Sequence, residues 1–587
     1  MNRRAFLLGG VQLAVSSLLI GRLYQLQAVK SDTYRMMAED NRINLQLIVP
    51  ERGLILDRVG KPLASNHVNY RLMMERSAIK KKHDLFPLLA PLLDDPDFPL
   101  EQELQRQLRR TPHEQNIMLK EYLTWEEISA VEFNAPRLPG ISVEAGTVRH
   151  YPLGHYASHL VGYVGTPSRD EAKGNRLLRM PGVKIGKNGL EKREEVALQG
   201  KPGLRHMEVN ALGQYLKEID RKDSVNGQDM HCTISGELQA YAAQRLGEES
   251  GAVVVLDIET GDILTLCSVP AFDPNRFSRG ISHRYWNELM NNEKTPLLNK
   301  AITGQYPPGS TYKMIVGLQA LEKGLITPET TFFCPGHFEL GNHRFNCWKA
   351  SGHGHMNLRR AITQSCDTYF YHLAVALGMS DIAEMSREFG LGITYDLGIM
   401  GEKRGLIPTA DWKYASYNQL WQTGDTVNAS IGQGYVLTTP LQLAVMTARL
   451  ASGKKVMPRL SVSPDTPIFE EVSVSKSSLG LMQMAMYDVM TDDYGTARAS
   501  HIRQLGYEMA GKTGTSQVRR ITIRGQDQSL LPWKQRHHGL FVAFAPYHKP
   551  RYACAVVVEH GGSGSSVAAP VAKDVMIKAQ QIMGKGA

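Results

Sequence analysis

The sequence has few of the features that assign a protein to a class at once. Six cysteines in 587 residues are too few for a disulfide-stabilised scaffold, so any disulfide or metal site has to be argued locally. There is no phosphate-binding Walker loop, no zinc-finger series, no internal repeat and no dense Arg/Lys helix. The formal net charge is only +9, from 67 basic and 58 acidic residues. Such a diffuse excess suits an anionic membrane surface or polymer, and nucleic-acid binding is not expected.

Long apolar runs are also scarce, with one exception at the N-terminus. Residues 5–21 are almost entirely apolar and directly follow Arg3 and Arg4. This pattern predicts a single membrane-anchoring helix within residues 1–30, with both arginines on the cytoplasmic side. A cleaved secretory signal is the alternative, but no small-x-small cleavage site follows the run. No later run reaches the roughly 18 apolar residues of a membrane span, so the rest is expected to be an exported, water-soluble ectodomain.

The ectodomain divides into two parts at a polar turn near residue 225. Residues 31–225 consist mainly of short predicted strands and turns, but residues 76–137 change to charged helical segments separated by prolines, which predicts an inserted subdomain. In residues 226–587, strands at both ends enclose long helical stretches. This order predicts an antiparallel sheet closed by its first and last strands and covered by helices, an α+β fold. The expected helices of this second part are at 236–246, 311–322 and 368–377, and the expected strands are at 251–258, 262–267, 539–545 and 552–559.

A candidate nucleophile lies where a loop turns into a helix. Ser310 and Lys313 form a Ser-x-x-Lys motif directly after the breaker sequence Tyr-Pro-Pro-Gly. At this spacing the two side chains share one helical face, and the positive end of the helix dipole disfavours a protonated lysine. Lys313 is therefore placed to act as the base for Ser310. The motif alone is weak, because a helix cap followed by a solvated lysine gives the same pattern.

Two further motifs make the pattern specific. Residues 365–367, Ser-Cys-Asp, lie at a tight junction between two expected helices, where polar side chains can face a cleft. Residues 512–515, Lys-Thr-Gly-Thr, lie in a probable strand, and Gly514 is expected to let a ligand backbone approach. Ser-x-x-Lys, a Ser-Asp-Asn element and Lys-Thr-Gly, in this order, are the motif set of penicillin-binding proteins and class A β-lactamases.

On these motifs the chain resembles the class B penicillin-binding proteins, in particular those of the rod-shape (elongation) machinery. The resemblance covers nearly the whole ectodomain. It implies an elongated pedestal of the dimerisation type over residues 31–225, with an inserted head subdomain at about 76–137, and a penicillin-binding transpeptidase domain over 226–587. Besides the three motifs, the similar stretches are 50–58, 61–64, 149–165, 189–191, 432–434 and 438–442.

The second motif departs from the family pattern. It ends in Asp367, where asparagine is usual, a variant that the resemblance associates with the rod-shape subgroup. An aspartate cannot donate through an amide, so its substrate contact must be a donor unless it is protonated. The nearby Lys313 and Lys512 would favour the ionised form.

The resemblance implies a serine D,D-transpeptidase that cross-links peptidoglycan stem peptides during cell elongation. Ser310 would attack the carbonyl of the penultimate D-alanine, Lys313 would take its proton, and Ser365 would relay a proton to the leaving D-alanine. The lysine of the third motif would supply positive potential and its threonines would bind the terminal carboxylate. The backbone N–H groups of Ser310 and Thr515 would form the oxyanion hole, and β-lactams would acylate the same serine. The site residues carried over are Ser310, Lys313, Ser365, Asp367, Lys512, Thr513, Gly514 and Thr515.

Location and partners also follow from the resemblance. It implies a single-pass protein of the inner (cytoplasmic) membrane with its catalytic ectodomain in the periplasm, and no organic cofactor. Residues 30–225 contain no paired-glutamate glycosyltransferase motif, so glycan polymerisation needs a partner. The implied partners are the SEDS glycosyltransferase RodA and the scaffold MreC, with the anchor and residues 76–137 as contact regions.

Two other functions fit parts of the pattern. A D,D-carboxypeptidase or β-lactamase carries the same three motifs, but such enzymes are commonly single catalytic domains, whereas roughly 200 residues precede the catalytic part here. A membrane-anchored scaffold or antibiotic sensor with a vestigial serine is the other alternative, and the intact motif set argues against it.

Four possible metal ligands gather between the first two motifs: Cys334, Cys347, His353 and Cys366. A hairpin around residues 341–342 would bring the first two cysteines close together on adjacent strands. Three thiolates and one imidazole suit a structural zinc ion, which would hold the loop of the second motif in place. Some relatives of the resembled group carry a metal site beside the second motif. The alternatives are a disulfide between Cys334 and Cys347, or unlinked buried thiols.

Overall fold

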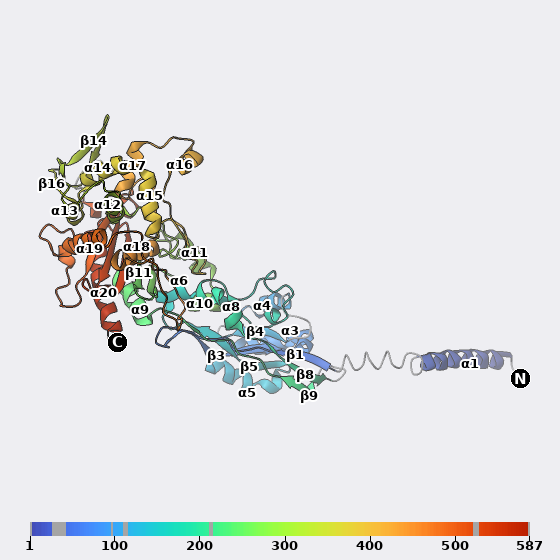
Figure 1. Ribbon diagram of the computed structural model, residues 1–587. Helices are drawn as coiled ribbons and strands as arrows, with labels where there is room; N and C mark the ends of the chain where they lie inside the picture. Colours follow the sequence, from blue (N-terminus) through green and yellow to red (C-terminus); the bar gives the residue numbers. More distant parts are fainter. Residues whose placement is uncertain are drawn as a thin grey trace.

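The order of elements in the chain separates two structural parts. The structure, a computed structural model, describes residues 3–25, 43–94, 98–109, 116–209, 215–519 and 527–584. Figure 1 shows an elongated part that carries β1 to β9 and a rounder part that carries α12 to α20. The predicted anchor at 1–30 falls on α1 (Arg3–Tyr24) and, from residue 26 on, outside the described residues. In the portion of the chain that the structure describes, no helix is both long and apolar enough to cross a membrane.

The elongated part, here called the pedestal, is built around one long strand. β3 (Pro62–Met74) pairs antiparallel with β5 (Ile141–His150) over ten residue pairs. β2 (Ile55–Leu56) and β4 (Ile117–Glu121) pair with its two ends, and β10 (Met230–His231) lies beside β2. A second sheet has the order β1-β8-β9, from strands Ile43–Ile48, Gly203–Val209 and Tyr215–Lys222.

The segment at 76–137, here called the head, packs on a hydrophobic core that is separate from the main core of the molecule and that it shares with Leu72, Met74 and Ile141 of β3 and β5. Its helices α3 (Lys82–Leu89), α4 (Leu100–Leu108) and α5 (Trp125–Phe133) bury leucines such as Leu104 against it. α5 begins at a capping box, in which the hydroxyl of Thr124 accepts from the backbone N–H of Glu127 and the Glu127 carboxylate accepts from the N–H of Thr124. β4 lies inside this segment, so the head is joined to the pedestal sheet by a strand as well as by its helices.

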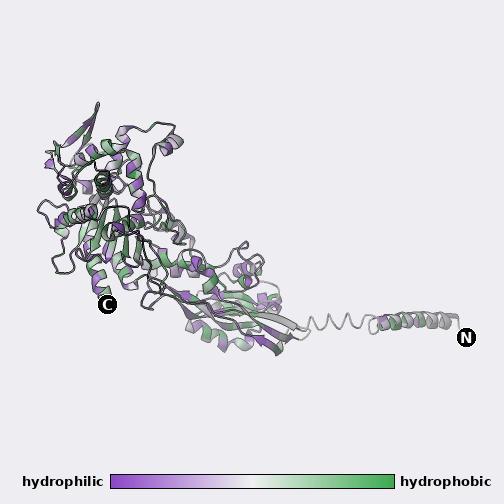
Figure 2. Ribbon diagram, viewed as in Figure 1, coloured by the Kyte–Doolittle hydropathy of each residue, from purple (hydrophilic) through white to green (hydrophobic). Residues whose placement is uncertain are grey.

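The rounder part contains the predicted antiparallel sheet. Its strand order is β12-β11-β19-β18-β17, and β11 pairs with β19 along its whole length. The first and last strands of this part are therefore neighbours, as predicted. Both faces of the sheet are buried because helices pack on it, and Figure 2 shows the hydrophobic residues concentrated there. The strands are β11 (Ser250–Asp257), β12 (Ile263–Val269), β17 (Ala510–Ser516), β18 (His538–Ala545) and β19 (Tyr552–Glu559), and the main helices on the sheet are α9 (Gly236–Leu246), α18 (Pro440–Ser452), α19 (Lys476–Thr491) and α20 (Ala569–Met583).

The three motifs lie on elements that meet at the β17 edge of this sheet. The predicted helix at 311–322 begins as a short 3-10 turn, η7 (Gly309–Tyr312), and continues as α12 (Lys313–Glu322). The second motif joins α13 (Leu358–Thr363) to α14 (Asp367–Leu377). The third motif is on β17, the strand at the end of the sheet order, which packs against η7.

The cysteine hairpin is present, but its pairing differs from the prediction. β14 (His337–Leu340) and β15 (His343–Asn346) enclose the predicted two-residue turn. Cys334, however, ends β13 (Phe332–Cys334), whose partner is β16 (Gly354–Met356). Cys347 follows β15 directly and donates its N–H to the Gly336 carbonyl at 2.9 Å. The two cysteines meet at the base of the hairpin, so the prediction of adjacent strands was wrong.

Candidate active site

The turn that carries Ser310 is fixed by close backbone packing. Gly309 has φ +56°, and its N–H donates to the Gly432 carbonyl at 2.9 Å. A side-chain carbon on Gly309 would lie 2.6 Å from the Thr515 carbonyl oxygen and 3.1 Å from the Thr515 nitrogen. Only glycine fits between these two neighbours, and the half-buried Ser310 is held against β17 as a result.

Gly514 serves this same contact. A side-chain carbon there would come within 2.9 Å of the Pro308 carbonyl oxygen and 3.0 Å of Thr311 Cγ2. The missing side chain lets the turn of Ser310 pack directly on β17. The approach of a ligand backbone along β17 at this position stays a prediction.

The second motif contains a strained backbone. α13 ends in a Schellman motif, in which the N–H of Cys366 donates to the Ala361 carbonyl at 2.9 Å and the N–H of Ser365 donates to the Ile362 carbonyl at 3.2 Å. Ser365 takes the left-handed position of this motif, with φ +57°, where glycine is usual. A side chain in this conformation costs about 1–2 kcal/mol, so the surrounding contacts must hold Ser365 in place.

The Ser365 hydroxyl lies between two lysine amines. Lys313 Nζ donates to Ser365 O at 2.9 Å and to its Oγ at 3.3 Å, and Lys512 Nζ donates to the same Oγ at 3.0 Å. Both lysine side chains are fully buried. In a 3-10 turn, side chains three residues apart lie one above the other, so Lys313 is also on the side of Ser310. The structure thus brings together the chemical groups of all three motifs.

Asp367 balances one of the two amines. Its Oδ1 accepts from Lys313 Nζ at 2.7 Å, and its Oδ2 accepts from the backbone N–H of Trp348 at 2.8 Å. Both carboxylate oxygens are thus paired with the protein's own donors, and Asp367 positions Lys313. Burial, and next the charge of Lys313, hold the pKa of Lys512 well below its usual value, and Asp367 opposes this only in part. Because one carboxylate serves two buried amines, one of the two amines readily loses its proton.

Three residues around the site were not predicted from the sequence. Trp348 Nε1 donates to the Ser365 carbonyl at 3.0 Å and ties the hairpin loop to the second motif. Gln433 Nε2 donates to the Thr515 carbonyl at 2.9 Å, and the hydroxyls of Thr496 and Thr513 are 2.8 Å apart. Gln433 lies in the similar stretch at 432–434, which was a usable signal. Trp348 and Thr496 each lie 17 positions from their partner and belong to none of the motifs, so no sequence pattern indicated them.

The four possible metal ligands converge beside the second motif. The ligand atoms of Cys334, Cys347, His353 and Cys366 all lie within 4.8 Å of one another. His353 Nδ1 is 3.6 Å from the sulfur of Cys334 and 3.5 Å from that of Cys347. A tetrahedral zinc ion with usual bond lengths sets sulfur and nitrogen about 3.6 Å apart, so the donor set fits zinc. All six cysteines of the chain are free, so the structure does not contain the alternative disulfide.

A hydrogen bond from Cys366 lowers the pKa values of the Cys334 and Cys347 thiols, and their hydrogen bonds with His353 act in the same direction. Deprotonated thiols are the form that binds metal. Cys366 lies between Ser365 and Asp367, and Cys347 precedes Trp348. The cluster and the candidate active site therefore share one stretch of backbone.

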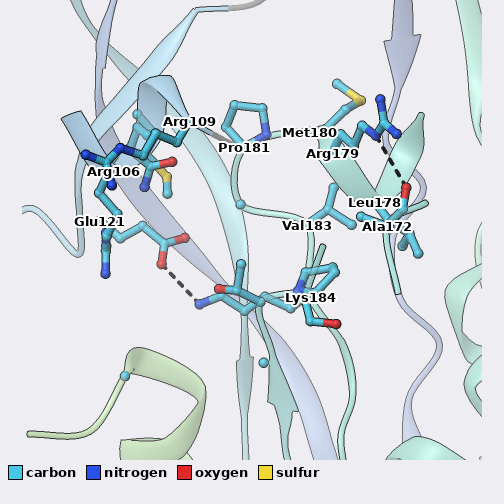
Figure 3. Close-up of a pocket in the computed structure, with 18 of the residues that line it drawn as sticks. Arg106, Arg109, Glu121, Ala172, Leu178, Arg179, Met180, Pro181, Val183 and Lys184 are labelled. Atoms are coloured by element: carbon cyan, nitrogen blue, oxygen red, sulfur yellow. Dashed lines mark hydrogen bonds and ion pairs between the residues drawn. The ribbon is translucent and has the colours of Figure 1, made fainter. Parts of the chain in front are cut away.

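A wide cavity lies away from the three motifs. It has a volume of about 1050 Å³ and is lined by α4, residues 165–184 and the end of α10 (Pro274–Arg279). Figure 3 shows Glu121 and Lys184 joined on its wall, at 3.0 Å, and Lys184 also donates to the Ser278 carbonyl at 2.7 Å. None of the motif residues lines this cavity, so it is a junction between head and catalytic part and not the candidate active site.

Comparison with known proteins defines the class. Residues 251–577 match the family model of the penicillin binding protein transpeptidase domain, and residues 47–232 match that of the penicillin-binding protein dimerisation domain. The chain belongs to the penicillin-binding proteins, and this two-domain arrangement is that of class B. Within the class it belongs with the proteins named MrdA or PBP2. The peptidoglycan D,D-transpeptidase MrdA of Haemophilus influenzae is 35% identical over 96% of this chain and 89% of that relative.

Two solved structures extend the likeness to three dimensions. PBP2 of Helicobacter pylori, solved in complex with MreC, has a TM-score of 0.82 at 30% identity and matches 92% of this chain and 99% of that one. A chain from a structure described as coordination of polymerization and crosslinking by a peptidoglycan synthase complex has a TM-score of 0.72 at 28% identity, with 98% of each chain covered.

Proposed function

We propose that this chain is a peptidoglycan D,D-transpeptidase, which cross-links stem peptides through an acyl-enzyme on Ser310 during cell elongation. The observation that carries the proposal is the Ser365 hydroxyl held between two buried lysine amines, beside the turn of Ser310. This arrangement can move a proton from the nucleophile to a leaving group.

Acylation begins when Ser310 Oγ attacks the carbonyl carbon of the penultimate D-alanine. Lys313 takes the hydroxyl proton after it has passed one of its own protons through Ser365 Oγ to the amine of Lys512, whose pKa is lowered by burial. When the tetrahedral intermediate collapses, the carbon–nitrogen bond breaks and the proton passes through Ser365 Oγ to the departing amine of D-alanine. The hydrogen-bonded series Lys313–Ser365–Lys512 supplies this path without a change in net charge.

Binding and charge stabilisation come from the edge strand. Thr513 and Thr515 bind the terminal carboxylate of the stem peptide beside the amine of Lys512. The N–H groups of Ser310 and Thr515 face the developing oxyanion. Removal of one such donor costs about 2.7–4 kcal/mol in acyl-transfer enzymes. A β-lactam opens on Ser310 in the same way, and an amine of a second stem peptide completes the normal reaction by attack on the acyl-enzyme.

The test uses the purified full-length chain. Fluorescent penicillin should label the wild-type protein and fail to label Ser310→Ala, and a pentapeptide donor with an acceptor amine should give a cross-linked product by mass spectrometry. Release of the tetrapeptide by water alone would instead identify a D,D-carboxypeptidase. Labelling without any turnover would identify a scaffold or sensor.

A structural zinc ion is also proposed, held by Cys334, Cys347, His353 and Cys366. The sulfur–nitrogen distances and the closed set of four ligands support it. Such an ion would hold the 365–367 backbone in position, and it would take no part in bond making. No organic cofactor is required by the chemistry.

Membrane attachment and partners complete the proposal. The apolar run at residues 5–21, directly after Arg3 and Arg4, supports a single-pass anchor in the inner membrane with the ectodomain in the periplasm. The similar structures solved with MreC and in a peptidoglycan synthase complex support MreC and the SEDS glycosyltransferase RodA as partners. The anchor and the head are the proposed contact regions.

A further inference from the structure

A second cavity lies between the pedestal and the transpeptidase domain. Its volume is about 370 Å³, and none of the motif residues lines it. The pedestal contributes His159, on α6 (Ser158–Val161), and Lys187. The transpeptidase domain contributes Asn299, from the loop before η7, and Met400.

Two buried side chains on the cavity wall carry polar atoms without a partner. Among the described residues, Nδ2 of Asn299 has no hydrogen-bond partner, and the ring of His159 has only a weak one, the Pro296 backbone carbonyl. The two residues are only 4% and 8% exposed. Their orientations are fixed, because His159 stands edge-on to Phe272 at 5.3 Å between ring centroids and Asn299 Oδ1 accepts from the Ala301 N–H at 3.2 Å. Unpaired buried polar groups cost free energy, so a ligand that pairs them is favoured.

The wall is close to electrically neutral. Burial, and next the charge of Lys300, lower the pKa of His159 to about 3, which the nearby Pro296 carbonyl opposes weakly. The ring is therefore neutral at physiological pH and offers one donor and one acceptor. The amine of Lys187 is paired with the Glu171 carboxylate at 2.5 Å, and no carboxylate is among the described residues that line the cavity.

We propose that this cavity binds an N-acetylated amino sugar of the glycan strand, an inference that rests on the proposed function. Apolar side chains such as Leu297 and Met400 suit the faces of a pyranose ring and the acetamido methyl group, while His159 and Asn299 pair with hydroxyl and amide oxygens. A neutral wall favours this ligand over a free phosphate or a peptide carboxylate. The volume lies at the small end of ligand pockets, which suits one or two sugar units.

The site is connected to the nucleophile through one loop. Asn299 lies on the segment that leads into η7, and that segment is anchored by Tyr306, whose N–H donates to the Thr438 carbonyl at 2.8 Å. A sugar bound to Asn299 would order this segment just before the turn of Ser310. Occupancy of the cavity would thus couple binding of the glycan strand to cross-linking of its peptide.

The test uses full-length protein whose Ser310 has first been acylated with penicillin, so that the active site is blocked. N,N′-diacetylchitobiose is the probe, cellobiose the control sugar without acetamido groups, and binding is followed by saturation-transfer NMR and calorimetry. Saturable binding of the diacetyl sugar and not of cellobiose is expected. Asn299→Asp, which keeps the contact to Ala301 and loses the amide donors, should weaken binding at least tenfold.

Two substitutions at Met400, on the rim of the cavity, control for misfolding. Met400 is 59% exposed, so Met400→Trp should block the cavity without disturbing the core, and Met400→Leu should bind like the wild type. Absence of saturable binding, or equal binding by Met400→Trp, would overturn the proposal. If the wild-type protein is labelled by penicillin but does not bind the sugar, only this inference fails. Loss of labelling would count against the proposed function instead.

Discussion

At the scale of single residues, Ser365 combines strain with chemistry. Its left-handed backbone is disfavoured for any residue with a side chain, yet its hydroxyl is the group that both lysines contact. The contacts that hold this strained backbone fix the hydroxyl between α13 and α14. A flexible loop would need to order this group in every reaction cycle.

Two substitutions at Ser365 separate strain from chemistry. Ser365→Gly should be more stable than Ser365→Ala by about 1 kcal/mol, because glycine adopts this conformation freely. Both variants should lose most of their penicillin acylation rate, since both lack the hydroxyl. Thermal unfolding and stopped-flow acylation measure the two effects. An alanine variant as stable as the glycine variant would show that the backbone is not strained.

Lys512 should make stability depend on pH. Its folded pKa is lowered by burial, so between that value and the usual lysine value of about 10.4 the unfolded chain binds more protons than the folded one. Stability contributed by this group therefore rises with pH across that window. Lys512→Met removes the titration and keeps the apolar stem. The melting temperature of the wild type, measured relative to that of Lys512→Met, should rise from about pH 7.5 to 9.5. The control Lys187→Met, at an ion pair nearer the surface, should show no such trend relative to the wild type.

At the scale of elements, sequence patterns predicted the positions of helices and strands better than they predicted which elements contact one another. The helix at 236–246 and the strand at 552–559 have the predicted ends, and the hairpin turn at 341–342 is confirmed. The glycine at 341 and the serine cap at 235 are local signals, which can be recognised from neighbouring residues in the sequence alone. The pairing of β13 with β16 is not local, because the hairpin lies between those strands in the sequence.

In the candidate site, too, local features could be predicted from the sequence and long-range contacts could not. The three motifs are local patterns, and their residues do converge. The packing of Gly514 depends on Pro308, some 200 residues earlier, and the pairing of Asp367 depends on the backbone of Trp348. Both contacts are made by backbone atoms, which every residue type has. Single-sequence reasoning has no signal for such contacts.

The proposed zinc site belongs to this scale because its four ligands would join a hairpin to the junction of two helices. Cys347→Ser or His353→Ala should lose bound zinc, lower the melting temperature and slow acylation of Ser310, since the energy of ligand binding is folding energy here. Cys554→Ala, in the buried strand β19 and outside the cluster, is the control and should keep its metal. Elemental analysis gives the metal content. Well under one zinc per chain in the wild type, or a mapped disulfide between Cys334 and Cys347, would rule the site out.

At the scale of the whole molecule, the head is bound to both other parts. β4 adds it to the pedestal sheet, and Lys184 links it to the transpeptidase domain through Glu121 and the Ser278 carbonyl. Its helices share one hydrophobic core with β3 and β5, so the head is packed firmly on the pedestal sheet. A partner that contacts the head could then act on the catalytic part through this junction.

Lys184→Met should loosen that junction without unfolding either side. The variant keeps the apolar stem and loses the charge-assisted hydrogen bonds to Glu121 and the Ser278 carbonyl, each worth about 1.5–3 kcal/mol, and a longer one to the Tyr122 hydroxyl. Hydrogen exchange should therefore become faster in both β4 and α10, while the penicillin acylation rate of the isolated enzyme stays near that of the wild type. Lys187→Met, which breaks an ion pair nearer the surface, is the matched control and should leave both elements protected. Faster exchange confined to one of the two elements would show that Lys184 packs locally and does not couple the head to the catalytic part.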